Sequence, residues 1–431
     1  MQIEALYSIY KQYPKISTDT RNIITDSIFF ALKGANFNGN AFADQALDSG
    51  ARYAVVDDVA YQKDERYILV EDVLTSLQDL ARYHRKQLHI PIIGITGTNG
   101  KTTSKELLYA VLSQRYKAFA TNGNLNNHIG VPLSILSIDA TIEIAIIEMG
   151  ANHLGEIAFL SDIAHPTHGL ITNVGKAHLE GFGSFDGVKK TKGELYDYLQ
   201  DHEGTLFLQG DNKDLVEMAS HRNIHKIVRY GFSPDNDVIG KLLIANPYLA
   251  ISWKERDKSA IYEVSTNLTG SYNTENFLAA IAVGLHFGVP AISINEGIAG
   301  YIPTNNRSQI TKTNRNTVVA DFYNANASSM VAALDNMKVL TVEHKVVILG
   351  DMFELGDDSY TEHAIIIQKA KALPLERLIF VGKEFFKHRS DDAEFYESTA
   401  DARTAIVGLS GSFILLKASR GMSFERLLEV L

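Results

Sequence analysis

The stretch IPIIGITGTNGKTTSKELLYAVL, residues 90–112, decides the fold class. Its apolar first half predicts a buried strand, and the spacing of Leu107, Leu108 and Val111 predicts a helix with one apolar face. A glycine-rich turn joins the two. Strand, loop and helix in this order are typical of parallel α/β sheets, which bind ligands beyond the carboxyl ends of their strands. The chain therefore belongs to the α/β class.

The turn has the chemistry of a phosphate-binding loop. Gly97 and Gly100 allow backbone N–H groups to point inward around a phosphate, Lys101 supplies a compact positive charge, and the Thr102 hydroxyl can bind magnesium. The spacing departs from the full Walker pattern, because Ile95 stands where its first glycine would be. An ordinary glycine turn is the alternative, but the Lys-Thr-Thr sequence before a helix favours a nucleotide site.

Length and composition indicate a globular protein of several domains. The chain has 431 residues, of which 45% are hydrophobic and 21% charged. At about 100–200 residues per domain, two to four domains are possible, and we expect three. The absence of cysteine excludes disulfides, thiolate metal sites and thiol nucleophiles.

Charge and hydropathy argue against two classes of partner. The formal charge of −10 opposes non-specific attraction to nucleic acid or to an anionic membrane. No stretch approaches the ~18 apolar residues of a membrane helix, and the first residues lack the pattern of a signal peptide. We expect no nucleic-acid partner, no membrane insertion and a cytosolic location.

The pattern of predicted strands and helices changes twice along the chain. Residues 1–85 predict a small mixed α/β domain. Residues 86–305 alternate apolar strands with helices, as in a parallel sheet, and within them residues 203–270 predict an antiparallel annex. Residues 306–431 alternate again, which predicts a doubly wound third domain.

Two further strands of the central region end in polar residues. The strand IEIAIIEMG is apolar until Glu148, which places a carboxylate beside the phosphate loop as a candidate magnesium ligand. The strand HGLITNVG brings Asn173 and, beyond it, His178 to the same edge. A solvated acid and a solvated or capping histidine are the alternatives at these two positions.

Two polar segments are ambiguous from pattern alone. Lys189, Lys190 and Lys192 precede a helix, and a solvated basic face is the simpler interpretation. The tetrapeptide DNKD, residues 211–214, suggests a guanine-reading motif of a GTPase, but Leu215 occupies the position of the expected aspartate. This segment is better interpreted as a polar turn.

Several longer motifs resemble the Mur ligase family, and the resemblance extends through nearly the whole chain. The motifs are TNGNLNNHIGVPLSIL, IIEMGANHLGEI, TNVGKAHLEGFGS, KGEL, DFYNANASSM and LGDMFELG. A tripeptide-forming member is expected to carry an Asp-Asn-Pro-Arg signature in its last domain, and none is present. The Tyr-Asn-Ala-Asn segment stands out instead.

The resemblance implies a fold and an activity. The fold is a three-domain Mur ligase architecture: a UDP-substrate domain, a central P-loop ATPase domain with a parallel sheet, and a Rossmann-like C-terminal amine-substrate domain. The activity is ATP- and Mg²⁺-dependent ligation of D-alanyl-D-alanine to UDP-N-acetylmuramoyl-tripeptide in peptidoglycan synthesis, by a monomer. The alternative enzyme is another Mur-type or folylpolyglutamate-type ligase, and the alternative without catalysis is a nucleotide-gated scaffold.

The resemblance also implies roles for individual residues. The catalytic residues are Lys101, His178 and Lys192. The ATP-binding residues are Gly97, Thr98, Asn99, Gly100, Lys101, Thr102, Thr103, Asn273, Asn276, Arg307 and Asp321. The metal ligands are Thr102, Glu148, His178 and Lys192, the last as a carbamate. The substrate-binding residues are Thr20, Arg21, Asn124, Asn127, Tyr323, Asn324, Asn326, Lys417, Ser419 and Arg420.

Four positions depart from the family pattern. Tyr272 stands where relatives often have histidine, at the adenine side. Ala327 replaces a usual proline, which leaves that turn less rigid. Ala418 replaces a glycine in the closing LLKASR segment, and TDTR, with Thr20, replaces the commoner Asp-Ser-Arg.

Overall fold

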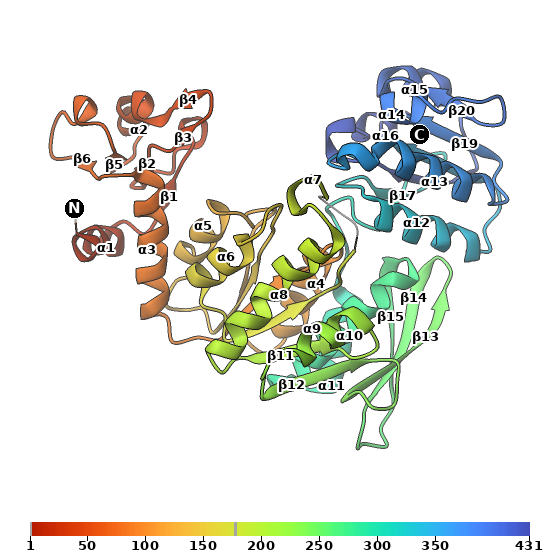
Figure 1. Ribbon diagram of the computed structural model, residues 1–431, viewed down its shortest axis with the longest axis horizontal. Coiled ribbons are helices and arrows are strands. Elements are labelled where there is room, and N and C mark those ends of the chain that lie inside the picture. The colour runs from red at the N-terminus through yellow and green to blue at the C-terminus, as the bar shows by residue number, and fades with distance from the viewer. Residues whose placement is uncertain (1, 176–178) are drawn as a thin grey trace.

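The computed structural model describes residues 2–175 and 179–431 as three α/β parts, each built on its own sheet (Figure 1). The largest sheets have four, nine and six strands. No helix among the described residues is long and apolar enough to cross a membrane.

The first part is a small parallel sheet in the order β1-β2-β5-β6. Its elements are α1 (Ile3–Gln12), β1 (Ile16–Ser17), η1 (Thr20–Asn22), β2 (Ile28–Phe30), β3 (Lys33–Gly34), β4 (Phe37–Asn38), η2 (Gly39–Phe42), α2 (Ala43–Asp48), β5 (Tyr53–Val56), η3 (Val59–Tyr61), β6 (Tyr67–Leu69) and α3 (Val73–Gln87). Helix α3 begins at the cap Asp72, whose side chain accepts from the backbone N–H of Thr75. Because α3 also packs on α5 and α6, it joins this part to the central one.

The central part is a nine-stranded sheet in the order β15-β14-β13-β12-β11-β10-β7-β9-β8. Its strands are β7 (Ile92–Thr96), β8 (Ala118–Ala120), β9 (Ile144–Glu148), β10 (His168–Ile171), β11 (Thr205–Gln209), β12 (Lys226–Gly231), β13 (Val238–Ala245), β14 (Tyr248–Glu255) and β15 (Tyr262–Thr269). Its helices are α4 (Lys101–Leu112), α5 (Gly130–Leu136), α6 (Glu156–Ala164), α7 (Leu179–Phe182), α8 (Phe185–Asp201), α9 (Lys213–Ser220), η4 (Ser271–Asn273), α10 (Thr274–His286) and α11 (Ala291–Gly300).

The predicted antiparallel annex is only partly correct. Strands β11 and β12 continue the parallel sheet, β12 also pairs in parallel with β13, and only β13, β14 and β15 pair antiparallel. Helix α9 supplies the crossover between β11 and β12, which is why a parallel pairing is possible there. In the DNKD segment Asp211 lies in a turn, Asn212 caps α9 by accepting from the N–H of Leu215, and Lys213 and Asp214 are the first residues of the helix, so the predicted polar turn is correct only for its first half.

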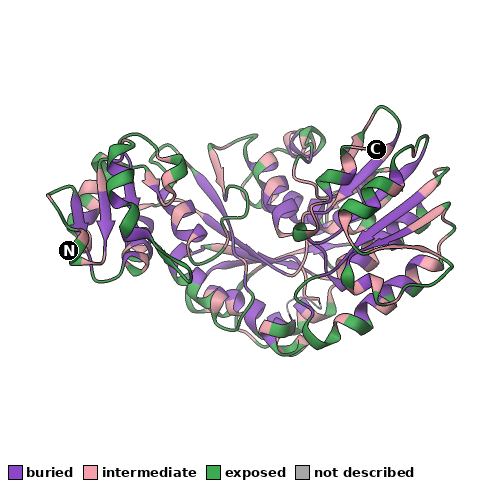
Figure 2. Ribbon diagram, turned by 90° about the horizontal axis from the view of Figure 1, so that it is seen from above, coloured by how far each residue is buried: buried purple, intermediate pink, exposed green. Residues whose placement is uncertain are grey.

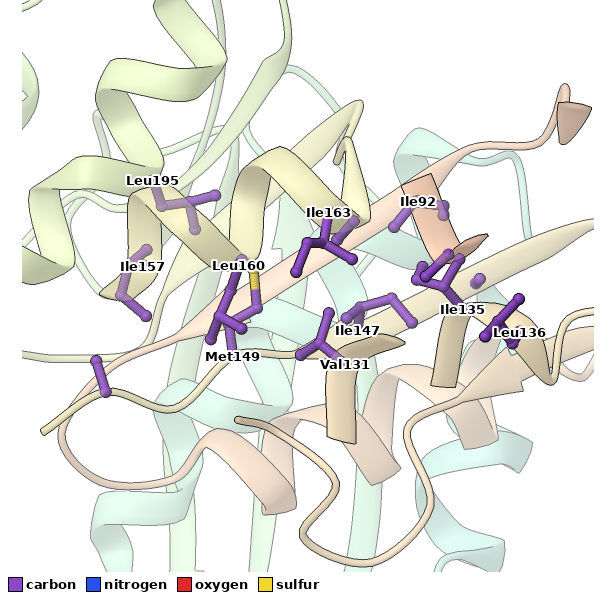
Figure 3. Packing of buried hydrophobic residues seen from close by; sticks show 14 of the residues in the cluster. Ile92, Val131, Ile135, Leu136, Ile147, Met149, Ile157, Leu160, Ile163 and Leu195 are labelled. Carbon is purple, nitrogen blue, oxygen red and sulfur yellow. The ribbon is translucent and has the colours of Figure 1, made fainter. Parts of the chain in front are cut away.

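The inner strands of the central sheet are largely buried (Figure 2). Their apolar residues belong to two clusters, one on each face of the sheet. On one face, Ile92, Ile147 and Met149 pack against α5, α6 and α8 (Figure 3). On the other face, Ile93 and Ile95 pack against α4, α10 and α11. Each fully buried Ile or Leu contributes about 1.5–3 kcal/mol to the stability of the folded state. The two clusters therefore stabilise the strands whose ends carry the polar loops.

The third part is a six-stranded sheet in the order β16-β17-β21-β18-β19-β20. Its elements are β16 (Gln309–Lys312), β17 (Thr317–Asp321), α12 (Ala327–Val339), β18 (Lys345–Gly350), η5 (Gly356–Asp358), α13 (Ser359–Lys371), β19 (Arg377–Val381), α14 (Lys383–Phe386), β20 (Glu394–Tyr396), α15 (Thr399–Ile406), β21 (Phe413–Lys417), η6 (Arg420–Met422) and α16 (Glu425–Leu428). Strand β16 is antiparallel and the others are parallel, with helices on both faces, as the alternation predicted.

Candidate active site

A cavity of about 560 Å³ lies where the central part meets the third part. It is lined by the phosphate loop, the end of β9 and the residues that follow it, the start of α10, the residues just before β16, and the end of β17 with the residues after it. The predicted site residues that line it are Thr98, Asn99, Gly100, Lys101, Thr102, Thr103, Asn124, Asn127, Glu148, Asn273, Asn276, Arg307, Asp321, Tyr323, Asn324, Asn326 and Lys417.

The phosphate loop requires both of its glycines. Gly97 has φ 141° and Gly100 has φ 79°, in the region that favours glycine. A Cβ at Gly97 would lie 2.0 Å from the Oγ1 atom of Thr172, so the neighbouring strand leaves no room for a side chain. Asn173 braces the loop further, since its Oδ1 accepts from the backbone N–H of Asn99 at 3.0 Å.

Lys101 lies against the loop from which it extends. Its Nζ donates to the carbonyl oxygens of Gly97 at 2.8 Å and Thr98 at 3.2 Å. Burial lowers the pKa of this ammonium, while the nearby Glu148 carboxylate raises it. An ammonium held by two neutral carbonyls can transfer its hydrogen bonds to a phosphate without losing an ion pair.

Glu148 has one carboxylate oxygen without a hydrogen-bond partner in the part of the chain that the structure describes. It is the last residue of β9, paired in register with Ile95. Its Oε1 accepts from Asn126 Nδ2 at 2.9 Å, whereas its buried Oε2 has no hydrogen-bond partner among the described residues. The Lys105 ammonium lies 3.9 Å from Oε2. A buried carboxylate oxygen without a hydrogen-bond partner is costly unless a cation or water satisfies it. Together with the Thr102 hydroxyl, which lines the same cavity, it fits a magnesium ion.

Lys192 is deeply buried, not solvated. It lies in α8 with 3% of its surface exposed, and its Nζ donates weakly to the Ala151 carbonyl oxygen at 3.5 Å. Burial, and secondarily the charge of Lys101, lower its pKa to about 7. Lys192 is not among the residues that line the cavity.

One of the other predicted metal ligands cannot be placed. His178 lies outside the described residues. Within the described ranges, no three His, Asp or Glu side chains gather into a group that could hold a metal ion. Ligands of another kind, such as the Thr102 hydroxyl or a modified Lys192, would have to complete a set with Glu148.

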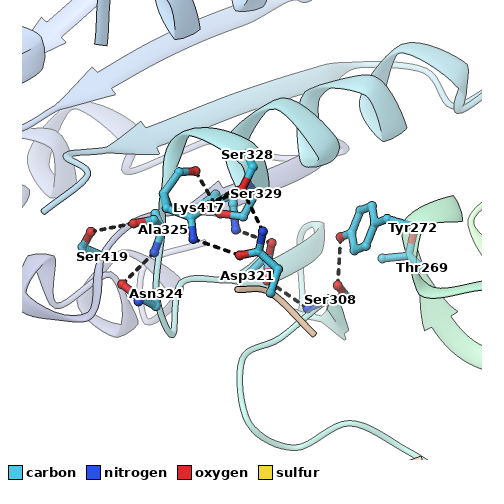
Figure 4. A network of polar contacts seen from close by, with 12 residues as sticks. Thr269, Tyr272, Ser308, Asp321, Asn324, Ala325, Ser328, Ser329, Lys417 and Ser419 are labelled. Atoms are coloured by element: carbon cyan, nitrogen blue, oxygen red, sulfur yellow. Dashed lines mark hydrogen bonds and ion pairs between the residues drawn. The ribbon is translucent and has the colours of Figure 1, made fainter. Parts of the chain in front are cut away.

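The two asparagines assigned to the adenine side form a buried amide pair. Asn276 Nδ2 donates to Asn273 Oδ1 at 2.9 Å, and Asn276 Oδ1 accepts from the Ser104 hydroxyl of α4 at 3.1 Å. Beside them the hydroxyl of the half-buried Tyr272 contacts the Ser308 hydroxyl at 2.8 Å (Figure 4). Through this contact Tyr272 links the central part to the third part.

The third part contributes a polar network to the cavity (Figure 4). Lys417 Nζ donates to Asp321 Oδ2 at 2.7 Å, and the two side chains are 2% and 15% exposed. Arg307 lies over the ring of Tyr323, with 3.9 Å between guanidinium and ring centre. Asn326 caps α12 in a capping box with Ser329.

Five other predicted site residues do not line the cavity. Thr20 and Arg21 form η1 of the first part, where Arg21 pairs with Asp19 at 2.5 Å. Ser419 is buried behind the cavity and donates to the Ala325 carbonyl oxygen at 3.4 Å. The Arg420 guanidinium lies 5.2 Å from the centre of the Tyr323 ring. Gly97 belongs to the phosphate loop but is not among the residues that line the cavity.

Several lining residues were not singled out from the sequence. They are Asn126, His128, Asn152, His153, Glu156, Phe159, Leu160, Ser308, Ser329 and Ala332. The first two lie in the TNGNLNNH motif next to Asn124 and Asn127, so that asparagine-rich run was the available signal.

Three family profiles match the chain in the order of its three sheets. The profile described as "Mur ligase family, catalytic domain" matches residues 12–85, the Mur ligase middle domain matches 95–284, and the profile "Mur ligase, glutamate ligase domain" matches 306–419. This order defines the class of the protein, a three-domain Mur ligase.

Similar proteins of known name show to which branch of the Mur ligase family the chain belongs. The chain is 33% identical over 433 residues to the UDP-N-acetylmuramoyl-tripeptide-D-alanyl-D-alanine ligase of Bacillus subtilis, covering 96% of this chain and 92% of that protein. The Escherichia coli ligase of the same name is 33% identical over 425 residues, with 96% and 93% covered. The chain belongs to the Mur ligase family, in the branch of the UDP-N-acetylmuramoyl-tripeptide-D-alanyl-D-alanine ligases.

Solved structures agree with this placement. MurF from Acinetobacter baumannii superimposes with a TM-score of 0.86 at 29% identity, covering 96% of this chain and 92% of that one. MurF ligase from Thermotoga maritima in complex with ADP gives a TM-score of 0.85 at 25% identity, with 96% of both chains covered. Folylpolyglutamate synthase of T. maritima, at 13% identity, covers 83% of this chain and 92% of that one and shares the fold alone, with a TM-score of 0.62.

Proposed function

We propose that this enzyme joins D-alanyl-D-alanine to UDP-N-acetylmuramoyl-tripeptide at the expense of ATP, giving UDP-N-acetylmuramoyl-pentapeptide, ADP and phosphate. The observation that carries the proposal is that one cavity contains the phosphate loop, the Glu148 oxygen that has no hydrogen-bond partner among the described residues, and the polar edge of the third part. Relatives named for this reaction match 96% of the chain.

The chemistry explains why a phosphate loop serves an amide-forming enzyme. A carboxylate does not accept an amine unaided, because its oxygen is a poor leaving group. Transfer of the γ-phosphoryl group of ATP to the terminal carboxylate of the tripeptide gives an acyl phosphate and ADP. The amine of D-alanyl-D-alanine then attacks the acyl carbon, an amide bond forms, and phosphate leaves with the former carboxylate oxygen.

The chain's own groups stabilise the charge that develops in transfer. Lys101 exchanges its bonds to Gly97 and Thr98 for bonds to the γ-phosphate, and the loop N–H groups hold the phosphates. Bound magnesium supplies further neutralisation of the phosphate oxygens. Its proposed ligands are Thr102, Glu148, His178 and Lys192 as a carbamate.

We assign the remaining site residues to ATP, to the UDP-linked peptide or to the amine substrate. The proposed ATP-binding residues are Gly97 to Thr103, Asn273, Asn276, Arg307 and Asp321. The residues proposed to bind the UDP and muramoyl ends of the peptide substrate are Thr20, Arg21, Asn124 and Asn127. For the amine substrate they are Tyr323, Asn324, Asn326, Lys417, Ser419 and Arg420.

Domain closure is a functional expectation. We take residues 1–85 to bind the UDP substrate, 86–305 to bind ATP, and 306–431 to bind the amine. Since water hydrolyses an acyl phosphate, the domains have to exclude water when all three substrates are bound. We further infer a monomer that acts in the cytosol, where ATP and nucleotide-linked precursors occur.

One experiment tests the reaction and its alternatives together. The protein is incubated with UDP-muramoyl tripeptide, ATP, Mg²⁺ and D-alanyl-D-alanine, and the product mass is measured. The expected product carries two added alanine residues and forms together with ADP. A mass increase only with a different amine, or with glutamate on a folate acceptor, would identify another ligase of this fold. ATP binding without acceptor-dependent phosphate release would identify a scaffold.

A further inference from the structure

Two histidines face each other far from the cavity. His168 is the first residue of β10 and His286 is the last residue of α10. Their Nε2 atoms are 3.2 Å apart, with ring centres 5.1 Å apart and ring planes inclined at 70°. The cavity is lined by Asn173, which follows the other end of β10. Along an extended chain, Asn173 is roughly 16 Å from His168.

The spacing of the two nitrogens is that of ligands on one metal ion. Imidazole nitrogens bind zinc at about 2.0–2.1 Å, so two of them on a tetrahedral ion lie about 3.3–3.4 Å apart. We propose that His168 and His286 together bind one divalent transition-metal ion, of the Zn²⁺, Ni²⁺ or Cu²⁺ class, at a site distinct from the nucleotide cavity. Water fills the remaining coordination positions.

Hydrogen bonds behind His168 orient the ring for this role. Thr167 Oγ1 donates to the Ile92 carbonyl oxygen at 3.2 Å and accepts from the Ile92 N–H at 3.0 Å. Because that hydroxyl proton is used, we assign the 2.8 Å contact between Thr167 Oγ1 and His168 Nδ1 to donation by the ring. The lone pair is then on Nε2, toward His286. A metal-binding histidine is oriented in this way by its second nitrogen.

The surroundings favour a cation held by neutral rings. His286 lies in the last turn of α10, where the partial negative charge of the helix C-terminus attracts a cation. Phe287 packs on both imidazoles, with centres 4.8 Å from His168 and 5.0 Å from His286. Burial lowers the pKa of both histidines, so neither needs to lose a proton at physiological pH. The nearby Lys226 ammonium also lowers the pKa of His168, but its positive charge repels a bound cation and so limits the affinity.

The donor set also selects the ion. Imidazole suits Zn²⁺, Ni²⁺ and Cu²⁺, whereas Mg²⁺ prefers oxygen ligands and retains its water. The ion would link β10 to α10 within the central part and stabilise the folded state by mass action. It takes no part in phosphoryl transfer.

The test compares metal binding by three full-length proteins. Wild type, His286→Gln and His221→Gln are stripped with a chelator and titrated with Zn²⁺ by calorimetry in Mg²⁺-free buffer. His221, an exposed histidine after α9, is the matched control. Wild type and His221→Gln are expected to bind one more equivalent than His286→Gln. Saturating Zn²⁺ should raise the melting temperatures of wild type and His221→Gln by several degrees more than that of His286→Gln.

A second measurement identifies the ligands. One equivalent of Cu²⁺ on the wild type should give an electron paramagnetic resonance spectrum with two nitrogen ligands, and His168→Gln or His286→Gln should lose it. Melting curves without metal check that each variant is folded. Equal Zn²⁺ stoichiometry and equal stabilisation in wild type and His286→Gln would mean that the pair is a hydrogen bond only, and would overturn the proposal.

Discussion

Asn326 Nδ2 donates a hydrogen bond to Asn99 Oδ1 at 2.9 Å, which joins the start of α12 to the phosphate loop. Asn99 Nδ2 in turn donates to the Ser328 hydroxyl at 2.8 Å. Asn326 also caps α12, so its position is fixed by the third part. The loop to which we assign the nucleotide phosphates is thus in direct contact with the domain assigned to the amine.

Replacing Ser328 with alanine tests this contact. The change removes the acceptor of the Asn99 side chain and the hydrogen bond that the Ser328 hydroxyl donates to Asn326 Oδ1 at 2.9 Å, while the Ser329 N–H still donates to the Asn326 cap. We expect kcat/KM to fall about 5- to 10-fold, the equivalent of roughly 1 kcal/mol, with little change in melting temperature. Ser390→Ala, at an exposed position of the same domain, should leave both quantities unchanged. Wild-type kcat/KM in Ser328→Ala would show that the contact has no role in turnover.

Lys101→Ala removes the positive charge of the phosphate loop. The rate of acceptor-dependent phosphate release should fall by about 10²–10³-fold or more, because a charge-stabilising group at the transferring phosphate is lost. Binding of the UDP substrate, measured by calorimetry, should remain close to wild type, since Thr20 and Arg21 lie in another part of the chain. Lys117→Ala, an exposed lysine of the same domain, is the control. Unchanged turnover would contradict the role assigned to Lys101.

The sequence was sufficient where the chemistry is local. The apolar run before Gly97 and the run that ends at Glu148 predict two strands, and parallel pairing places Ile95 opposite Glu148. Once both strands are in one sheet, a phosphate loop and a carboxylate must meet at its edge. This part of the cavity follows from pattern and topology alone.

The remainder depends on packing between distant segments. Lys189, Lys190 and Lys192 look alike in the sequence, but Lys189 pairs with Asp214 and Lys190 is exposed, whereas Lys192 is buried against Ala151. Nothing in the run itself predicts which lysine is desolvated. Contacts such as Asn99 with Asn326 likewise depend on how two domains dock.

The buried pair of Lys417 and Asp321 is expected to stabilise the third part. Lys417→Met leaves the Asp321 carboxylate without its partner, which should cost about 3 kcal/mol, at the low end for a buried pair because Asp321 opens onto the cavity. The double change Asp321→Asn with Lys417→Met should recover most of this loss. Urea unfolding followed by circular dichroism gives the midpoints. Equal midpoints for Lys417→Met and wild type would show that the pair contributes nothing to stability.

Carbamate formation on Lys192 should depend on pH. Only a neutral amine reacts with CO₂, and burial lowers the pKa of Lys192 to about 7, far below that of an exposed lysine. The modified fraction should therefore rise as pH increases through about 7. With ¹³C-bicarbonate, a carbamate resonance should be weak at low pH, stronger at high pH and absent from Lys192→Ala. A signal that falls with increasing pH would contradict this assignment.

Loss of Lys192 should be repaired by a small acid. If a carbamate on this side chain directs a cation, Lys192→Ala removes an anionic group and leaves a space beside Ala151. Formate or acetate can enter that space and restore the negative charge, so added acid should recover part of the lost phosphate release. Wild type and Lys190→Ala, in which an exposed lysine is removed, should show no gain. If Lys192→Ala is inactive at every acid concentration while remaining folded, the ammonium itself, not a carbamate, is the functional group.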